Sequence, residues 1–247
     1  MFLMRIDLSN LNLLPASAFD KLGTTYGGWH IPKNIQLNKN SVCYLAGAGE
    51  DISFDCELAK KFGCEIHIFD PTPRAIEHFN NLHKEIIRGG KLCINSNESE
   101  YYDIDIKTFQ LMAFHEIGIA GKDCELKFFY PKDQNHVSCS AQNIQNTEEF
   151  FIAKCFCLQT IMNNLGHTKI DLVKLDIEGA EYEVIQNIVD SAVLPSILAV
   201  EFHRLHDDHN MEKDIFNIIK LLYKNDMKIV FVDGFDATFV KKTFMPE

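Results

Sequence analysis

Residues 45–55, LAGAGEDISFD, are the stretch that decides the fold. They follow an apolar run, SVCYLA (41–46), that is typical of a buried strand, and they lead into a segment with apolar side chains at helical spacing. Gly47 and Gly49 permit a tight turn at which the backbone can approach a ligand closely. A strand, a glycine turn and a helix start in this order favour a nucleotide or nucleoside site, because the first N–H groups of the helix face the ligand.

Asp70 supplies a second feature of such a site. It directly follows the apolar run CEIHIF (64–69) and lies 23 residues after Gly47. In a doubly wound sheet, a carboxylate at the end of the second strand can accept hydrogen bonds from both ribose hydroxyls. We therefore predict that Asp70 binds the ribose of a cofactor that sits on Gly47 and Gly49.

The other side chains of the turn indicate which cofactor fits. The third glycine of a dinucleotide motif would fall where the chain has Ile52, and Glu50 and Asp51 would repel a pyrophosphate. S-adenosylmethionine (SAM) has no phosphate, and its sulfonium and ammonium groups are positive. We predict a SAM site in which Glu50 and Asp51 attract these charges and Ser53 binds the carboxylate. The alternative is that the two acids only cap the helix.

Strand-like and helix-like segments alternate along most of the chain, as in parallel sheets that are covered on both faces. We predict an α/β fold with a doubly wound, mostly parallel sheet that closes with an antiparallel pair, KIVFVD (228–233) and ATFVKK (237–242). Residues 1–247 are expected to form a single domain, with residues 1–40 as an N-terminal segment. Further strands are expected within 109–120, 124–131, 170–176 and 196–202, helices along 73–87, 180–189 and 211–222, and a polar surface loop over 132–149.

Composition and charge exclude several classes of protein. The 247 residues include 24 basic and 35 acidic side chains, and the net charge of −11 disfavours binding to nucleic acid. No apolar run approaches the roughly 18 residues that a membrane span needs, so no membrane span is predicted. The eight cysteines form no C-x-x-C pair, which favours buried thiols in a reducing compartment and a cytoplasmic protein.

Four segments in this order resemble the FkbM family of SAM-dependent methyltransferases: YGGW (26–29), the run at 47–55, FDPTP (69–73) and VKLDIEGAEYEVI (173–185). The resemblance covers roughly residues 23–205. It implies a class I, Rossmann-like methyltransferase fold whose seven-stranded sheet ends in an antiparallel strand. The activity that it implies is O-methylation, often of sugars or of natural-product hydroxyls.

The resemblance also implies contacts to the cofactor. Tyr26 and the backbone of Gly27 would lie near the methionine tail, and Ile117 would lie near the adenine. Trp29 is open to two interpretations, a lid on the core or a cofactor contact. The chain departs from the wider methyltransferase pattern at Leu45, where an acid is common, and this leaves the ammonium group to Glu50 or Asp51.

The acceptor side of the predicted site contains Asp176, Glu201 and His203. Asp176 and Glu201 fall at the carboxyl ends of two expected strands, where doubly wound sheets bind ligands. This arrangement resembles macrocin-type sugar methyltransferases, in which strand-end carboxylates bind a divalent cation. We predict that Asp176, Glu201 and His203 bind Mg²⁺ or Mn²⁺, with His203 as an alternative general base.

Weaker candidates surround this set. Asp176 and Glu178 could instead stabilise the start of the next helix. His206 and His209 are interpreted as an exposed polar loop. Ser138 and Ser140 lie in a segment that could cover the acceptor.

The function that we expect is SAM-dependent O-methylation of a sugar hydroxyl, with a sugar that is nucleotide-activated or destined for a surface polysaccharide. The partner is then a small molecule or a sugar nucleotide. Two alternatives remain open: methylation of a non-sugar small molecule, and a SAM-binding module without catalysis. An NAD-type oxidoreductase is disfavoured by Ile52, Glu50 and Asp51.

Overall fold

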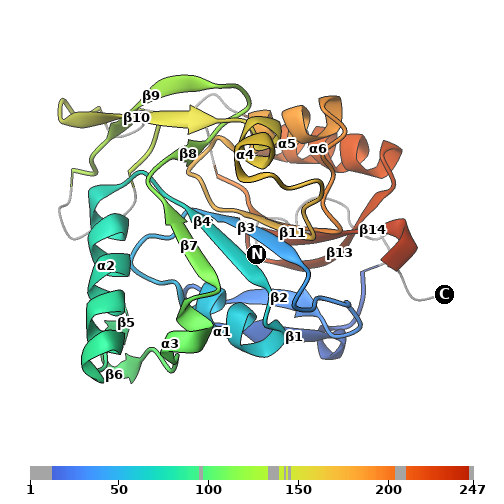
Figure 1. Cartoon of the computed structure of the whole chain (residues 1–247). Helices are drawn as coiled ribbons and strands as arrows, with labels where there is room; N and C mark the ends of the chain where they lie inside the picture. The colour runs from blue at the N-terminus through green and yellow to red at the C-terminus, as the bar shows by residue number, and fades with distance from the viewer. Residues whose placement is uncertain are drawn as a thin grey trace.

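A seven-stranded sheet forms the centre of the molecule (Figure 1). The computed structural model describes residues 13–94, 97–132, 139–141, 143, 146–203 and 210–244, and the statements below concern these residues. The strands of the sheet span Val42–Ala46 (β3), Glu65–Phe69 (β4), Met112–His115 (β7), Leu172–Leu175 (β11), Ile197–Glu201 (β12), Met227–Asp233 (β13) and Asp236–Lys241 (β14).

The strand order is β13-β14-β12-β11-β3-β4-β7. Every pair in the sheet is parallel except the two that β14 makes with β12 and β13. Along the chain, β4 and β7 extend the sheet on one side of β3, and β11 and β12 then extend it on the other side. The order therefore reverses between β3 and β11, and ligands bind at such a reversal, beside the carboxyl ends of the strands.

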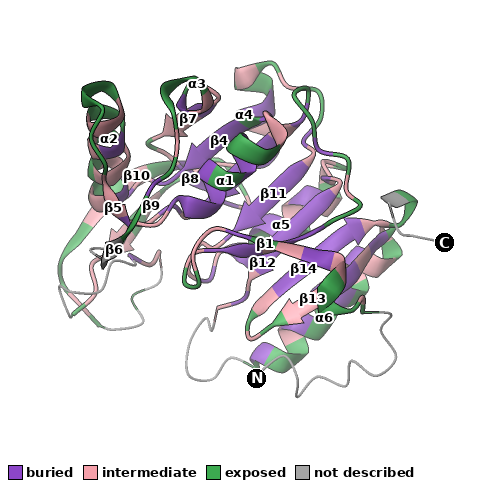
Figure 2. Ribbon diagram, turned by 90° about the horizontal axis from the view of Figure 1, so that it is seen from below, coloured by how far each residue is buried: buried purple, intermediate pink, exposed green. Residues whose placement is uncertain are grey.

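Helices cover both faces of the sheet (Figure 1). The helices α4 (Leu158–Leu165), α5 (Glu181–Asp190) and α6 (Met211–Lys224) pack on one face and contribute to one buried core. The second core lies between the other face and the helices α1 (Ser53–Phe62), α2 (Pro73–Arg88) and α3 (Ile106–Phe109). Because both faces are covered, the inner strands β3, β4, β11 and β12 consist almost entirely of buried residues, which are purple in Figure 2, whereas the edge strands β7 and β13 are only partly buried.

Smaller sheets flank the central one. The hairpin of β1 (Phe19–Leu22) and β2 (Trp29–Pro32) adds to the core beside α1. A three-stranded sheet in the order β8-β10-β9 comprises Gly118–Ile119 (β8), Phe150–Phe156 (β10) and Cys124–Phe129 (β9). The remaining elements are β5 (Cys93–Ile94), β6 (Asn97–Tyr101) and two short 3₁₀ turns, Ala16–Ala18 (η2) and Lys242–Phe244 (η3).

The predicted α/β class, the mostly parallel sheet and its antiparallel last strand are confirmed. The stretch expected to contain one strand, residues 109–120, instead contributes β7 to the central sheet and β8 to the smaller one. Ser138, His206 and His209 lie outside the described residues, as does much of the loop expected over 132–149. Among the described helices, none has the length and apolar character that crossing a membrane requires.

Candidate active site

A cavity of about 460 Å³ opens at the carboxyl ends of β3, β4, β11 and β12. This volume is in the range of small-molecule sites, roughly 300–1,000 Å³. The cavity brings together segments that are far apart in the sequence, including the turn before β2, the glycine turn after β3 and the end of β12. The predicted site residues that line it are Tyr26, Gly27, Gly47, Gly49, Glu50, Asp51, Asp70, Asp176, Glu201 and His203.

Two predicted cofactor residues lie elsewhere. Ser53 begins α1 and is buried, and its Oγ accepts a hydrogen bond from the N–H of Thr24 at 2.9 Å, so it fixes the turn before β2 and does not line the cavity. Ile117 packs against the core on the α4 face. Its neighbours Gly118 and Ile119 line the cavity instead, because the chain turns between β7 and β8.

A steric clash explains why the first position of the glycine turn is a glycine. Gly47 has φ +81°, and a Cβ built there would lie 1.7 Å from the carbonyl oxygen of Asp176. Gly49 also has a positive φ, +53°, but a Cβ there would have no heavy atom within 4 Å. Gly47 is therefore required by the close approach of the turn to the end of β11, whereas Gly49 is required only by its backbone angles.

Asp70 shapes the same turn. It is buried, and its Oδ2 accepts hydrogen bonds from the N–H groups of Ala48 at 2.8 Å and Gly49 at 3.1 Å. Its Oδ1 accepts from the N–H and the hydroxyl of Thr72, at 2.8 and 2.6 Å. The carboxylate thus fixes the glycine turn to β4 while it lines the cavity. Its contact with a ribose stays a prediction.

The two acids after the glycines also have protein partners. Glu50 forms a bidentate ion pair with Arg74, with Nη2–Oε2 and Nε–Oε1 distances of 2.6 and 3.1 Å. Asp51 accepts from the hydroxyl of Thr24 at 2.6 Å, and a Cβ on Gly27 would lie 2.6 Å from its carboxyl carbon. Arg74 compensates the charge of Glu50, so of these two acids Asp51 is better placed to attract an ammonium group.

His203 lies at the centre of the acidic side of the cavity. Its Nε2 is 3.8 Å from a carboxylate oxygen of each of Asp176, Glu178 and Glu201. Its Nδ1 is 2.8 Å from Oε1 of Glu181. The imidazole is thus oriented by Glu181, and the nitrogen that remains faces three carboxylates.

Glu181 was missed by the sequence interpretation. It is completely buried in the first turn of α5, and its Oε1 also accepts from the N–H groups of Ile177 and Gly179, at 3.2 Å each. These bonds fix the turn after β11, in which Glu178 has a left-handed backbone with φ +54°. Within the described residues, Oε2 of Glu181 is a buried oxygen without a hydrogen-bond partner.

The pKa values reflect the concentration of negative charge. Burial lowers the pKa of His203, but the hydrogen bond to Glu181 and the nearby carboxylates outweigh it and raise the pKa to about 10. Burial and the charge of Asp176 raise the pKa of Glu201 to about 7 and that of Asp236 to about 6. The cluster therefore favours a bound positive charge, which a proton or a cation can supply.

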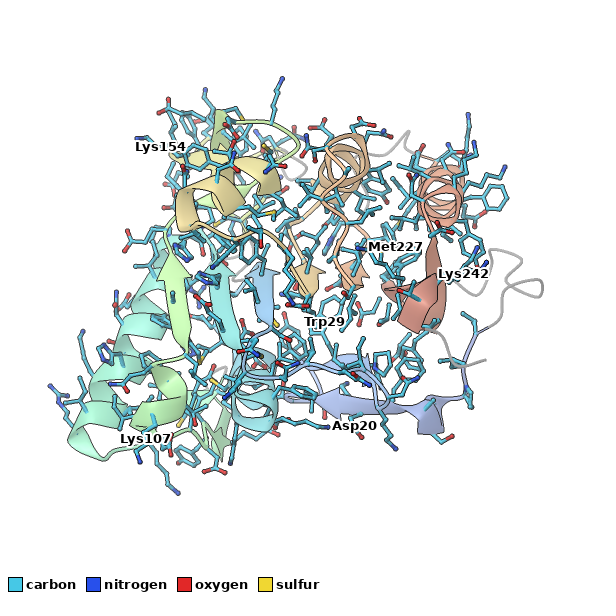
Figure 3. The ribbon with its side chains drawn as sticks, turned by 45° about the vertical axis from the view of Figure 1, so that its right-hand side comes forward. Asp20, Trp29, Lys107, Lys154, Met227 and Lys242 are labelled. Atoms are coloured by element: carbon cyan, nitrogen blue, oxygen red, sulfur yellow. The ribbon has the colours of Figure 1, made fainter. Side chains whose placement is uncertain are left out.

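Lys174 is a second residue that sequence reasoning missed. It is buried in β11, and its ammonium group donates to the carbonyl of Gly47 and to Oδ2 of Asp176, the latter at 3.4 Å. It also lies 5.5 Å from the ring centre of Trp29. Trp29, labelled in Figure 3 between the sheet and the hairpin layer, is buried and lines the cavity. Lys174 thus joins the glycine turn to the acidic side of the cavity.

The strand order with its inserted antiparallel strand, the glycine turn and Asp70 define a class I SAM-dependent methyltransferase. The sequence model of the methyltransferase FkbM domain matches residues 44–228. The chain therefore belongs to the FkbM methyltransferase family, and the resemblance seen in the sequence is confirmed.

The relatives and solved structures are more distant. "Probable methyltransferase-like protein 24" of Homo sapiens is 25% identical over 233 residues, 85% of this chain and 50% of that protein. The protein of the same name from Rattus norvegicus is 25% identical over 198 residues, 75% of this chain and 41% of that protein. The chain thus spans half or less of the length of these curated relatives.

Among solved structures, an rRNA methylase from Streptococcus thermophilus is 13% identical, with a TM-score of 0.43, and covers 83% of this chain and 89% of its own. TYW2 from M. jannaschii in complex with AdoMet is 10% identical, with a TM-score of 0.37, and covers 93% and 89%. The strand order of the sheet, and not these similarities, carries the fold assignment.

Proposed function

We propose that the chain transfers a methyl group from SAM to a hydroxyl oxygen of a sugar, either nucleotide-activated or destined for a surface polysaccharide. The observation that supports this is the set of carboxylates around His203 in the cavity that also contains the glycine turn. Carboxylate oxygens accept hydrogen bonds, and several of them on one wall suit an acceptor with neighbouring hydroxyls. A module that only bound SAM would not need this wall.

The cofactor end of the cavity fits SAM. Gly47 and Gly49 line the cavity, and Asp70 keeps their turn in place. Asp51 and Tyr26 also line the cavity. Bound there, SAM supplies an electrophilic methyl group, and the chain's contribution is to orient the acceptor oxygen and to remove its proton.

The acceptor end fits a divalent cation. Asp176, Glu178 and His203 each offer a ligand atom, and these atoms lie within 4.8 Å of one another. Glu178 thus takes the place that we predicted for Glu201, which lies outside this group although its Oε1 is 3.8 Å from Nε2 of His203. A cation such as Mg²⁺ or Mn²⁺ would lower the pKa of an acceptor hydroxyl. His203 is the alternative base, because Glu181 fixes its Nδ1 and leaves Nε2 facing the cavity. As a base it must first lose the proton that the carboxylates favour.

The test is transfer of a labelled methyl group from SAM to a panel of nucleotide-linked and free sugars. We expect an O-methylated product, loss of turnover with EDTA and recovery with Mg²⁺ or Mn²⁺. Asp176→Asn should abolish turnover and keep SAM affinity, because Asp176 acts on the acceptor side. Glu125→Gln, at an exposed position of β9, is the matched control and should behave as the unmodified protein.

Three results would contradict parts of the proposal. Turnover that is unchanged by EDTA would rule out a required cation. His203 would then be the candidate base, and His203→Ala with a pH–rate profile would test it. A product that is methylated on nitrogen or carbon would contradict the proposal that the acceptor atom is oxygen. SAM binding without transfer to any sugar, but with transfer to a phenolic or other non-sugar hydroxyl, favours the second candidate acceptor class.

A further inference from the structure

A second cluster of metal-ligating side chains lies at the opposite end of β4 from Asp70. It consists of Glu65 and His67 on β4 and His167, which follows the end of α4. Oε1 of Glu65 is 2.9 Å from Nε2 of His67 and 3.7 Å from Nε2 of His167. The three ligand atoms all lie within 4.8 Å of one another, so they face one common point.

The other nitrogen of each histidine has a partner of its own. Nδ1 of His67 is 2.9 Å from Nε2 of His115 on β7, and Nδ1 of His167 is 2.6 Å from the hydroxyl of Tyr44 on β3. Histidines that bind metals use one nitrogen for the ion and commonly donate from the other to a neighbouring acceptor. Both rings are therefore oriented with Nε2 toward Glu65.

Packing also holds the imidazole of His67 in place. The rings of His67 and Phe69 stack on that of His115, with centroids 5.2 and 4.8 Å away, so the imidazoles are confined by packing.

We propose that Glu65, His67 and His167 form a site for a divalent transition metal of the zinc class. Two imidazole nitrogens and one carboxylate are a common zinc ligand set, with metal–ligand distances near 2.0–2.1 Å that place the ligand atoms about 3.3 Å apart in a tetrahedron. The observed separations of 2.9 and 3.7 Å bracket that value. The side chain of Glu65 is 52% exposed, which leaves room for water as the fourth ligand.

The role of such a metal would be structural. It would tie the start of β4 to the segment after α4, two parts of the chain about 100 residues apart. Local unfolding of α4 away from β4 would then require loss of the metal. The cluster also contacts the cofactor site through packing, because Phe69 stacks on His115 and lines the cavity. Neither part of this role requires the catalytic carboxylates.

The experiment is titration of the chelator-treated protein with Zn²⁺ in a calorimeter, in an Asp176→Asn background that weakens the site at the catalytic cluster. We expect one Zn²⁺ per chain and a higher melting temperature with the metal. Glu65→Gln and His167→Gln should each weaken binding at least about 10–100-fold, which is the effect of altering even an outer partner of a metal ligand. Glu77→Gln, on the exposed face of α2, should leave the affinity unchanged.

Tyr44→Phe adds a test of orientation without removing a ligand. It deletes only the hydroxyl that contacts His167 and should weaken Zn²⁺ binding about 10-fold. Circular dichroism of the metal-free variants confirms that they fold. The proposal is overturned if the parent protein binds no Zn²⁺ at micromolar concentrations, or if folded Glu65→Gln and His167→Gln bind it as tightly as the parent does.

Discussion

Two glycines of the same turn should tolerate a side chain very differently. In Gly47→Ala the new Cβ meets the Asp176 carbonyl, so strain from the positive φ adds to a backbone clash, and we expect a loss of about 2–5 kcal/mol of unfolding free energy. Gly49→Ala has the φ strain alone and should cost about 1–2 kcal/mol. Urea denaturation of both variants measures the difference. Equal losses would show that the turn can move away from β11.

Single residues also show what the sequence could not supply. The glycine turn and the ends of two further strands predict that Gly47, Asp70 and Asp176 lie at one edge of the sheet, because strand ends in a doubly wound sheet meet there, and all three residues line one cavity. The partners of these residues were not predictable. Glu181 contacts His203 only because α5 packs beside the end of β12, and a glutamate at a helix start carries no sign of such a contact.

At the scale of elements, α1 carries a buried acid in its first turn. Burial raises the pKa of Asp55 to about 6 although Lys174 opposes the shift, whereas the ordinary value is 3.8. The folded state therefore takes up this proton at a higher pH than the unfolded state, and the contribution of Asp55 to stability rises as the pH falls from 7 to 5. The expected gain is about 1 kcal/mol.

Asp55→Asn removes this dependence. The unfolding free energy of the unmodified protein, relative to that of the variant, should increase by about 1 kcal/mol between pH 7 and pH 5. Denaturation curves at several pH values measure the difference, and other acids such as Asp236 cancel in the comparison. Parallel pH profiles for the two proteins would contradict the assignment to Asp55.

The elements that the sequence predicted are those with a strong repeat or a long apolar run, such as α2, α6 and the parallel strands of the central sheet. The missed elements are short or half-exposed. Helix α4 has two turns, too few for a clear helical period, and β1 and β2 have four residues each. Strand β10 alternates between exposed and partly buried residues in a small flanking sheet, so it lacks the continuous apolar signal of the core strands.

For the whole molecule, cofactor binding should appear as added stability. SAM at about 100 times its dissociation constant contributes about 2.7 kcal/mol. For a chain of this size that corresponds to a rise in melting temperature of about 5–10 °C. Asp70→Ala should reduce the rise, since it removes both the proposed ribose contact and the bonds that fix the glycine turn. NAD is the control ligand and should give no rise; a rise with NAD and none with SAM would contradict the cofactor assignment.

The position of β14 in the sheet has a consequence for biosynthesis. This strand lies between β12 and β13, yet residues 236–241 follow both of them in the chain. While the ribosome is still making β13, β12 has no neighbour on that side, and the central sheet is limited to β12-β11-β3-β4-β7. The backbone edge of β12 and the apolar surface beneath α6 are then open to other chains. Translation that pauses before residue 236 should therefore lengthen the period in which the nascent protein depends on chaperones.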